Sequence, residues 1–411
     1  MSYPDLEVLN SQVSRIFRID DVTAGNPREW IVRYRGQLLG EDSAAAYDQL
    51  AEAMRPYGVT PLFRKGEDGR QVIFLAPVIQ IPKPSRRATI NIVLFILTIL
   101  SMMFTAVDIP PETASTLDGP AFLFYKLEHL LTGWPFALSM MGILFAHEMG
   151  HYIACRYYKI PATLPFFIPA PDLSPLGTFG AFIAMRGIPK NKRILFDVGV
   201  AGPLAGLLIA IPVLWYGLSI SPLGPIDRPP VGFSGFLEGN SIFYLLSKYL
   251  IFGRFLPEPT SMGNLSPFTY WLQYFFSGHP IPYGGLDVQL DSVALAGWGG
   301  LLVTALNLVP VGTLDGGHVA HGLFGEKARR IFPAMIGLLI ALSFLPVLLT
   351  FSFASFNYGW LLWVMILFWL GNVRTTPLDD ITELDPVRRL VALLVLILFI
   401  LLFTPVPMAV Y

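Results

Sequence analysis

The chain has 411 residues, of which 54% are hydrophobic and only 14% are charged, and its formal net charge is -1. Soluble domains carry about 25% charged residues, so the composition predicts an integral membrane protein. A near-neutral chain has no basic stripe to neutralise phosphates, which excludes nucleic acid from the expected partners. The single cysteine, Cys155, excludes an internal disulfide and a cysteine-based zinc site.

Residues 1–76 are expected to form a small soluble α/β domain. Apolar residues recur at helical spacing in two stretches and alternate in a third, and a Gly-Glu-Asp-Gly turn signal separates two further apolar runs. Asp42 and Ser43 form a cap signal in front of the second helix. Two roles stay open for this domain: a regulatory or substrate-sensing role, and that of a generic cytosolic appendage. The predicted elements are a helix, a strand, a helix and a hairpin, at residues 6–17, 30–35, 47–54 and 62–75.

Residues 77–87 form a predicted stiff linker that contains prolines and ends in cations. Cations beside a first span predict that the amino-terminal domain is cytoplasmic. The first 40 or so residues contain several acids and lack a continuous apolar core, so the first span, and not a cleavable leader, is expected to target the chain.

Apolar length predicts about seven transmembrane α-helices in a membrane domain of residues 88–406. Inner loops rich in cations alternate with outer segments that contain acids, which predicts an inside amino terminus and an outside carboxyl terminus. A zinc core is expected at about 134–217 and 292–325, and an outer insertion at 218–291 with a short interfacial helix at 241–250. The expected spans are about 88–107, 134–156, 194–217, 292–312, 331–352, 356–372 and 388–406.

The stretch 160–187 is apolar but cannot be a straight span. It contains several prolines, followed by Gly177, Thr178, Phe179 and Gly180. Non-helical backbone at membrane depth is tolerated only where protein covers it or where it lines a cavity. The stretch is therefore expected to form a re-entrant β-hairpin or loop.

The sequence His147-Glu148-Met149-Gly150-His151 lies late in the second expected span. Residues four apart share one face of a helix, so His147 and His151 can present two imidazole nitrogens to one metal ion, with Glu148 beside a bound water. His and Glu are costly to bury in a membrane and are usually functional there. This pattern predicts a hydrolytic zinc site.

A catalytic zinc takes three protein ligands and keeps an open position for water. A later span ends in a proline turn at Asn307 to Pro310 that leads to Asp315, at the same predicted depth as His151. Asp315 is therefore the expected third ligand. Two alternatives stay open: Asp315 caps the following helix, or His318 or His321 binds the metal instead.

The paired motifs resemble the site-2 protease family of intramembrane zinc metalloproteases. Stretches 164–169, 177–180 and 196–206 resemble its subgroup of ethylene-dependent gravitropism-deficient and yellow-green proteases. The family motif residues in this chain are His147, Glu148 and His151, and then Asn307, Pro310, Leu314, Asp315, Gly316 and Gly317.

This resemblance implies hydrolysis of a single-span membrane protein within or near the lipid bilayer. One zinc ion per chain would polarise the scissile carbonyl and activate water, while Glu148 takes the proton of that water and delivers it to the leaving amine. Asn307 either stabilises the oxyanion or satisfies backbone groups that Pro310 leaves free. Asp197 is expected to pair with cations at the interface, and Gly199, Gly202 and Gly206 to permit tight helix packing.

A helical substrate must be locally extended before its peptide bonds can be attacked. A strand edge within 177–183 can pair with such a segment, and Gly177 and Gly180 allow close backbone approach. Thr178 and Phe179 complete this expected substrate-binding stretch. The alternative is a purely structural plug.

Two other functional classes are weighed against a protease. Broken spans with ionisable residues also occur in transporters, but no paired repeat of the two broken segments is evident here. A non-proteolytic membrane scaffold with a structural zinc site is the second rival. The expected location is a bacterial plasma membrane with the active site on the cytoplasmic side, because a plastid protein would need a transit sequence; the oligomeric state is left open.

Overall fold

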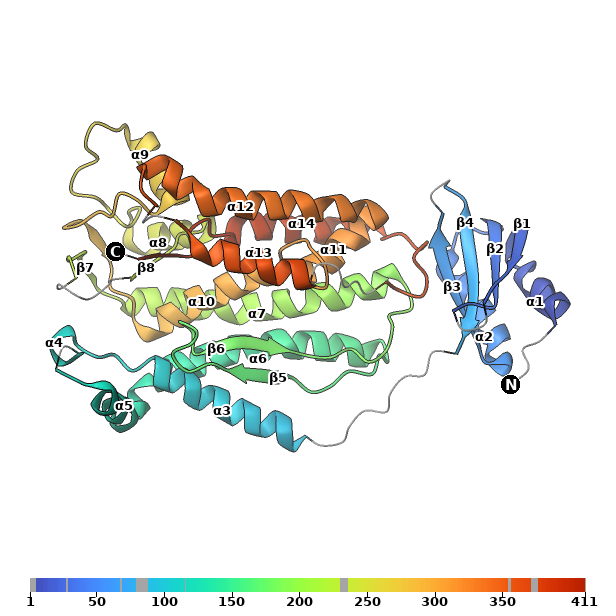
Figure 1. The fold of residues 1–411 in the computed structure, drawn as a ribbon, viewed down its shortest axis with the longest axis horizontal. Helices are drawn as coiled ribbons and strands as arrows, with labels where there is room; N and C mark the ends of the chain where they lie inside the picture. The colour runs from blue at the N-terminus through green and yellow to red at the C-terminus, as the bar shows by residue number, and fades with distance from the viewer. Residues whose placement is uncertain are drawn as a thin grey trace.

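The computed structural model describes residues 5–26, 29–66, 69–78, 88–114, 116–229, 236–353, 356–370 and 376–410. A small α/β domain and a larger helical domain lie end to end along the long axis of the molecule (Figure 1). Most of the predicted linker, including its cations Lys83, Arg86 and Arg87, lies outside the described residues.

The amino-terminal domain is a four-stranded antiparallel sheet, in the order β1-β2-β4-β3, with two helices. As predicted, Asp42 caps the second helix, because its carboxylate accepts hydrogen bonds from the backbone of Ala44 and Ala45. The first helix ends at Val13 and not at Phe17, so it is shorter than predicted. The elements are α1 (Leu6–Val13), β1 (Phe17–Ala24), β2 (Val32–Leu38), α2 (Ser43–Met54), a 3₁₀ turn (Arg55–Tyr57), β3 (Val59–Lys65) and β4 (Gln71–Pro77).

Residues 377–385, here called the anchor segment, join this domain to the helical domain. Phe63 of β3 exchanges two backbone hydrogen bonds with the anchor segment, of 2.9 and 3.0 Å. Ile381 is buried in the core of the amino-terminal domain. On its other side, the backbone N–H of Asp379 donates to the carbonyl of Lys190, at 2.7 Å. The anchor segment thus pairs with the open edge of the sheet.

Asp379 and Asp380 of the anchor segment are both buried, and Asp380 contacts two basic side chains of the helical domain. Its Oδ1 lies 2.8 Å from Nε2 of His321 and 3.5 Å from Nζ of Lys192. Burial alone would raise the pKa of Asp380, but the hydrogen bond with His321 and the charge of Lys192 hold this pKa below its ordinary value. The charged carboxylate therefore stabilises the fold above the ordinary carboxyl pKa, and this contribution is lost as the pH falls through the folded value.

Asp380→Asn is expected to lower the free energy of unfolding at pH 7 by on the order of 1–3 kcal/mol. The thermal midpoint of the purified protein should fall accordingly. The difference from the wild type should shrink as the pH falls below about 4. Asp48→Asn is the control, because the carboxylate of Asp48 pairs with Lys190 at 3.0 Å on the exposed surface, where ion pairs contribute at most about 1 kcal/mol. Equal midpoints for both variants at pH 7 would refute the role given to Asp380.

Each of the seven predicted spans coincides with a helix. Among the described residues, three stretches are long and apolar enough to cross a membrane: Leu130–Tyr157, Lys192–Ile220 and Asp315–Thr350. The full count of seven spans stays a prediction. The helices at the predicted positions are α3 (Thr89–Thr105), α6 (Trp134–Tyr157), α7 (Lys192–Ile220), α10 (Ser292–Asn307), α12 (Ile331–Thr350), α13 (Tyr358–Leu370) and α14 (Pro386–Leu402).

A buried lysine of the outer insertion contacts acids on two of its strands. Nζ of Lys248 lies 3.0 Å from a carboxylate oxygen of Glu238 and 3.2 Å from one of Asp287, and the lysine is fully buried. Lys248 belongs to α8, which confirms the predicted short helix at 241–250. The elements here are β7 (Leu223–Pro225), β8 (Phe236–Glu238), α8 (Ile242–Phe252), α9 (Pro267–Ser277) and β9 (Leu286–Val288), and β8 pairs with β10 (Met408–Val410).

The proline-rich stretch after α6 forms the expected β-hairpin. Strands β5 (Phe166–Pro169) and β6 (Thr178–Phe182) pair in antiparallel register beside α3 and α6 (Figure 1). Gly177 has a φ of +68°, and a Cβ there would lie 2.7 Å from Cα of Met102 on α3. Glycine is thus needed both for the turn and for the contact. The segment between α3 and α6 contains α4 (Pro111–Ala114), α5 (Gly119–Glu128) and a 3₁₀ turn (Leu130–Gly133).

Candidate metal centre

Two helices bring the predicted ligands together. His147 and His151 lie one turn apart on α6, and both are buried. The chain leaves α10 at Asn307, turns through Gly312 with a φ of +61°, and starts α11 (Asp315–Phe324) at Asp315. An acid in the first turn of a helix is favoured by the helix dipole. Asp315 is therefore fixed by its own helix and faces α6.

The three donor atoms form a nearly equilateral triangle. Nε2 of His147 and Nε2 of His151 are 3.2 Å apart, and each lies 3.3 Å from Oδ2 of Asp315. A tetrahedral zinc with ligand bonds of about 2.0–2.1 Å separates its ligand atoms by about 3.3–3.4 Å. The donor set and its spacing therefore fit a zinc ion with one position open for water.

A backbone carbonyl of α7 orients one of the imidazoles. Nδ1 of His151 lies 2.8 Å from the carbonyl oxygen of Val198. When Nδ1 donates its proton there, Nε2 is left with a free lone pair that points toward Asp315. Metal-binding histidines generally have such a partner for the second ring nitrogen.

Glu148 lies beside this triangle in a buried position on α6. Its carboxylate is hydrogen-bonded to the backbone of Ile183, directly after β6. The end of the hairpin and the acid are thus in contact. Asn307, the last residue of α10, places Nδ2 of its side chain 3.4 Å from Nε2 of His147. Both candidate catalytic residues therefore border the candidate zinc position.

His318 and His321, the alternatives for the third ligand, do not belong to the candidate donor cluster. Among the described residues, the one group of His, Cys, Asp or Glu donors within metal-binding reach consists of His147, His151 and Asp315. His318 is buried against Gly199, and His321 pairs with Asp380. The capping alternative also receives no support, since Leu314 is the N-cap and α11 has no side-chain cap hydrogen bond.

Helix α7 approaches the candidate ligands at a glycine. A Cβ on Gly202 would lie 2.1 Å from Nε2 of His151, which is too close for two atoms that are not bonded to each other. The predicted role of Gly202 was close helix packing; the structure places that packing against the metal-binding face of the imidazole. Sequence spacing alone could not show which of the four glycines of α7 meets that nitrogen.

Gly202→Ala is expected to displace the ring of His151 and to weaken zinc binding at least tenfold, by analogy with the loss of a residue that orients a ligand. Zinc content after dialysis against graded chelator measures this effect. Gly142→Ala on α6 is the matched control, because a Cβ there has nothing within 4 Å. Zinc retention equal to that of the wild type in Gly202→Ala would contradict this geometry.

Asp197 has the structural role expected of it. Its two carboxylate oxygens accept hydrogen bonds of 2.8 and 2.6 Å from the guanidinium of Arg388, and Tyr158 also donates to it. This bidentate pair joins α7 to α14. A cation partner was predicted, but Arg388 could not be identified from the sequence because it lies 191 positions further along the chain.

The four predicted substrate-binding residues lie at the turn and along β6 but differ in exposure. Thr178 is buried, and its hydroxyl donates to the carbonyl of Ile168 across the hairpin. Phe179 is 63% exposed. Gly180 has a φ of +92°, which glycine adopts without strain, and has open space where a side chain would be. Gly177 lies against α3, and its role in substrate binding stays a prediction.

Comparisons with known proteins place these residues in a family context. Residues 135–350 match the family described as "Peptidase family M50". The chain is 28% identical to "Probable zinc metalloprotease EGY2, chloroplastic" of Oryza sativa subsp. indica, over 98% of this chain and 66% of that protein. The Arabidopsis thaliana protein of the same name is also 28% identical, over 98% of this chain and 65% of its own length.

"Probable zinc metalloprotease EGY1, chloroplastic" of Oryza sativa subsp. japonica is 28% identical over 78% of this chain and 50% of that protein. The chain thus spans between half and two thirds of the length of these relatives. No solved structure matches the chain. The relatives are named chloroplastic, so they give no support to the expected bacterial plasma membrane.

Proposed function

The chain belongs to peptidase family M50, and on that premise we propose that it is a zinc endopeptidase that hydrolyses a peptide bond of a membrane-spanning protein within or near the bilayer. The observation that carries this proposal is the triangle of donor atoms of His147, His151 and Asp315, with edges of 3.2 and 3.3 Å. It lies between helices that are apolar enough to be embedded in a membrane.

Bound zinc would supply a Lewis acid for the scissile carbonyl and acidify a water molecule. Glu148, buried beside the ligands, takes the proton of the water and later delivers it to the leaving amine. Nδ2 of Asn307 lies beside His147 and can donate a hydrogen bond to the oxyanion. Turnover of a single-span substrate by the purified chain, compared with Glu148→Gln, tests this assignment.

We place the amino-terminal domain and the zinc centre toward the same side of the membrane. His151 is six positions before the end of α6 at Tyr157, and Asp315 begins the helix that bears His321. His321 in turn contacts the anchor segment, which pairs with the amino-terminal domain. Cation-rich loops at this end favour the cytoplasmic side, or its topological equivalent in an organelle.

We further propose that the substrate is extended along β6. One edge of β6 is paired with β5, and Ile183 just after β6 contacts the catalytic acid. A peptide added to the other edge would gain backbone hydrogen bonds and would run toward Glu148. Phe179, with its side chain exposed, is the residue expected to contact the apolar side chains of this peptide.

Phe179→Ala and Gly180→Ala are expected to reduce cleavage of a full-length single-span substrate at least tenfold while zinc content stays unchanged, because substrate-positioning contacts are lost. Gel-based turnover and metal analysis of the same preparations measure both quantities. Leu173→Ala is the control, since Leu173 is also highly exposed but lies in the turn before β6. Wild-type turnover in both hairpin variants would leave β6 with a structural role only.

A further inference from the structure

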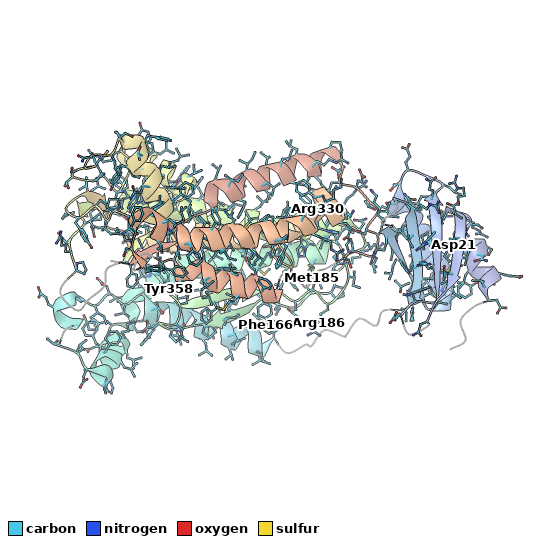
Figure 2. All side chains as sticks on the ribbon, turned by 45° about the horizontal axis from the view of Figure 1, so that its top comes forward. Asp21, Phe166, Met185, Arg186, Arg330 and Tyr358 are labelled. Atoms are coloured by element: carbon cyan, nitrogen blue, oxygen red, sulfur yellow. The ribbon has the colours of Figure 1, made fainter. Side chains whose placement is uncertain are left out.

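A cavity of about 770 Å³ lies where α3, α6 and the loop before β5 meet. Its wall includes Phe166 at the start of β5 and Arg186, and Figure 2 shows these two residues near the same end of the hairpin. Asn91 of α3 donates hydrogen bonds to the carbonyls of Leu164 and Pro165, at 3.1 and 2.8 Å. The loop that forms one wall is therefore tied to α3.

The charged side chains that line this cavity are all basic. Three cations line it, Arg156, Lys159 and Arg186, and its lining contains no Asp or Glu. Arg156 and Lys159 are exposed, and no ion pair joins either of them to another described residue. Two positive charges thus face the cavity without a carboxylate partner from the described part of the protein.

Lys159 is held in a conformation that lysine does not prefer. Its φ is +57°, in the left-handed region that usually belongs to glycine at the end of a helix. Backbone hydrogen bonds from Lys159 to Arg156 and from Ile160 to Cys155 fix this turn. The left-handed conformation is unfavourable for a residue with a Cβ, so Lys159 occupies this position beside the cavity against the preference of its backbone.

The mouth of the cavity lies at an apolar boundary. Ile90 on α3 and Leu164 in the loop before β5 both line the cavity and are 55% and 40% exposed, and Tyr157, which follows Arg156 in the chain, is 77% exposed. Tyrosine is enriched at the interface between membrane and water. Exposed apolar side chains therefore lie next to the cations. A glycerophospholipid has the matching arrangement, with acyl chains next to an anionic phosphate.

We propose that this cavity binds the anionic head group of a membrane phospholipid, with the phosphate beside Arg156 and Lys159 and the acyl chains along Ile90 and Leu164. Phosphate is the shared chemistry of a lipid and of soluble phosphates, but the exposed apolar mouth favours the lipid. The occupant is distinct from the cleaved peptide, because the lining includes β5 and α3 but none of β6. The proposal does not depend on proteolytic activity.

The test uses the full chain in mixed micelles with phosphatidylglycerol or phosphatidylcholine, and native mass spectrometry counts the lipids retained. The wild type should retain phosphatidylglycerol in preference. Removal of two cations, in Arg156→Gln with Lys159→Gln, should weaken this binding roughly thirtyfold. Lys327→Gln with Arg330→Gln removes the same charge from exposed positions outside the cavity and should bind as the wild type does; Arg330 lies apart from Phe166 and Arg186 in Figure 2.

Lys159→Gly removes one charge and relieves the left-handed turn, so it should fold at least as well as the wild type and still bind the lipid less tightly. Inorganic phosphate and glycerol phosphate serve as probes without acyl chains, and neither should displace the lipid at equal concentration. Equal weakening in the Arg156/Lys159 and Lys327/Arg330 variants, equal retention of both lipids, or displacement by free phosphate would each overturn the proposal.

Discussion

Glu148→Gln is expected to lower turnover of a single-span substrate at least a hundredfold while leaving the zinc content of the protein unchanged, because general acid–base groups typically contribute about 10²–10⁴-fold. Glutamine keeps the size of the buried side chain but cannot take a proton from water. The three donor atoms of the candidate zinc site belong to other residues, so binding of the metal does not require the acid. Metal analysis and turnover on the same preparation measure the two effects.

Glu128→Gln is the matched control for this change. Glu128 is exposed at the end of α5 and does not belong to the candidate donor cluster, so its substitution should leave both turnover and zinc content as they are. Turnover by Glu148→Gln within a few-fold of the wild type would remove Glu148 from the mechanism. Loss of zinc together with activity in this variant would instead show a role in building the site.

Asp315→Ala is expected to produce the second large effect, loss of the metal itself. A candidate zinc ligand disappears, and the two imidazole nitrogens lose the carboxylate oxygen that lies 3.3 Å from each of them. Zinc affinity should fall by more than the roughly 10–100-fold seen when a residue that only supports a ligand is removed. Zinc per chain after dialysis against chelator, with turnover on the same samples, gives the measurement.

His321→Gln is the control on the same helix, because His321 faces Asp380 and lies outside the candidate donor cluster. It should retain zinc. The assignment of the third ligand fails if Asp315→Ala retains zinc while His318→Ala or His321→Gln loses it.

The parts of this protein that are encoded locally could be predicted from the sequence. Apolar length located the helices, prolines and glycines located the hairpin at β5 and β6, and the spacing of His147 and His151 placed two imidazoles on one face. Asp315 was reached by combining span depth with a family motif. Each of these inferences uses residues that are near one another in the chain or share a predicted depth.

Contacts between distant segments could not be predicted in the same way. Strand β1 was missed because it is largely polar and exposed on one face, which removes the apolar alternation of a buried strand. The anchor segment is irregular, and its partner Phe63 lies more than 300 positions away. Val198 and Ile183 contact the site through main-chain atoms. Every residue has these atoms, so the residue type does not indicate which side chain they will bind; tertiary packing decides it.

The most direct test of the central claim is to map the bond that is cut. Purified protein in liposomes, given a single-span substrate, should yield two products whose new ends, read by mass spectrometry, lie within or next to the apolar segment. A zinc chelator and Glu148→Gln should each abolish those products. Cleavage confined to soluble regions of the substrate, or the same products from Glu148→Gln, would contradict an intramembrane endopeptidase with its zinc on His147, His151 and Asp315.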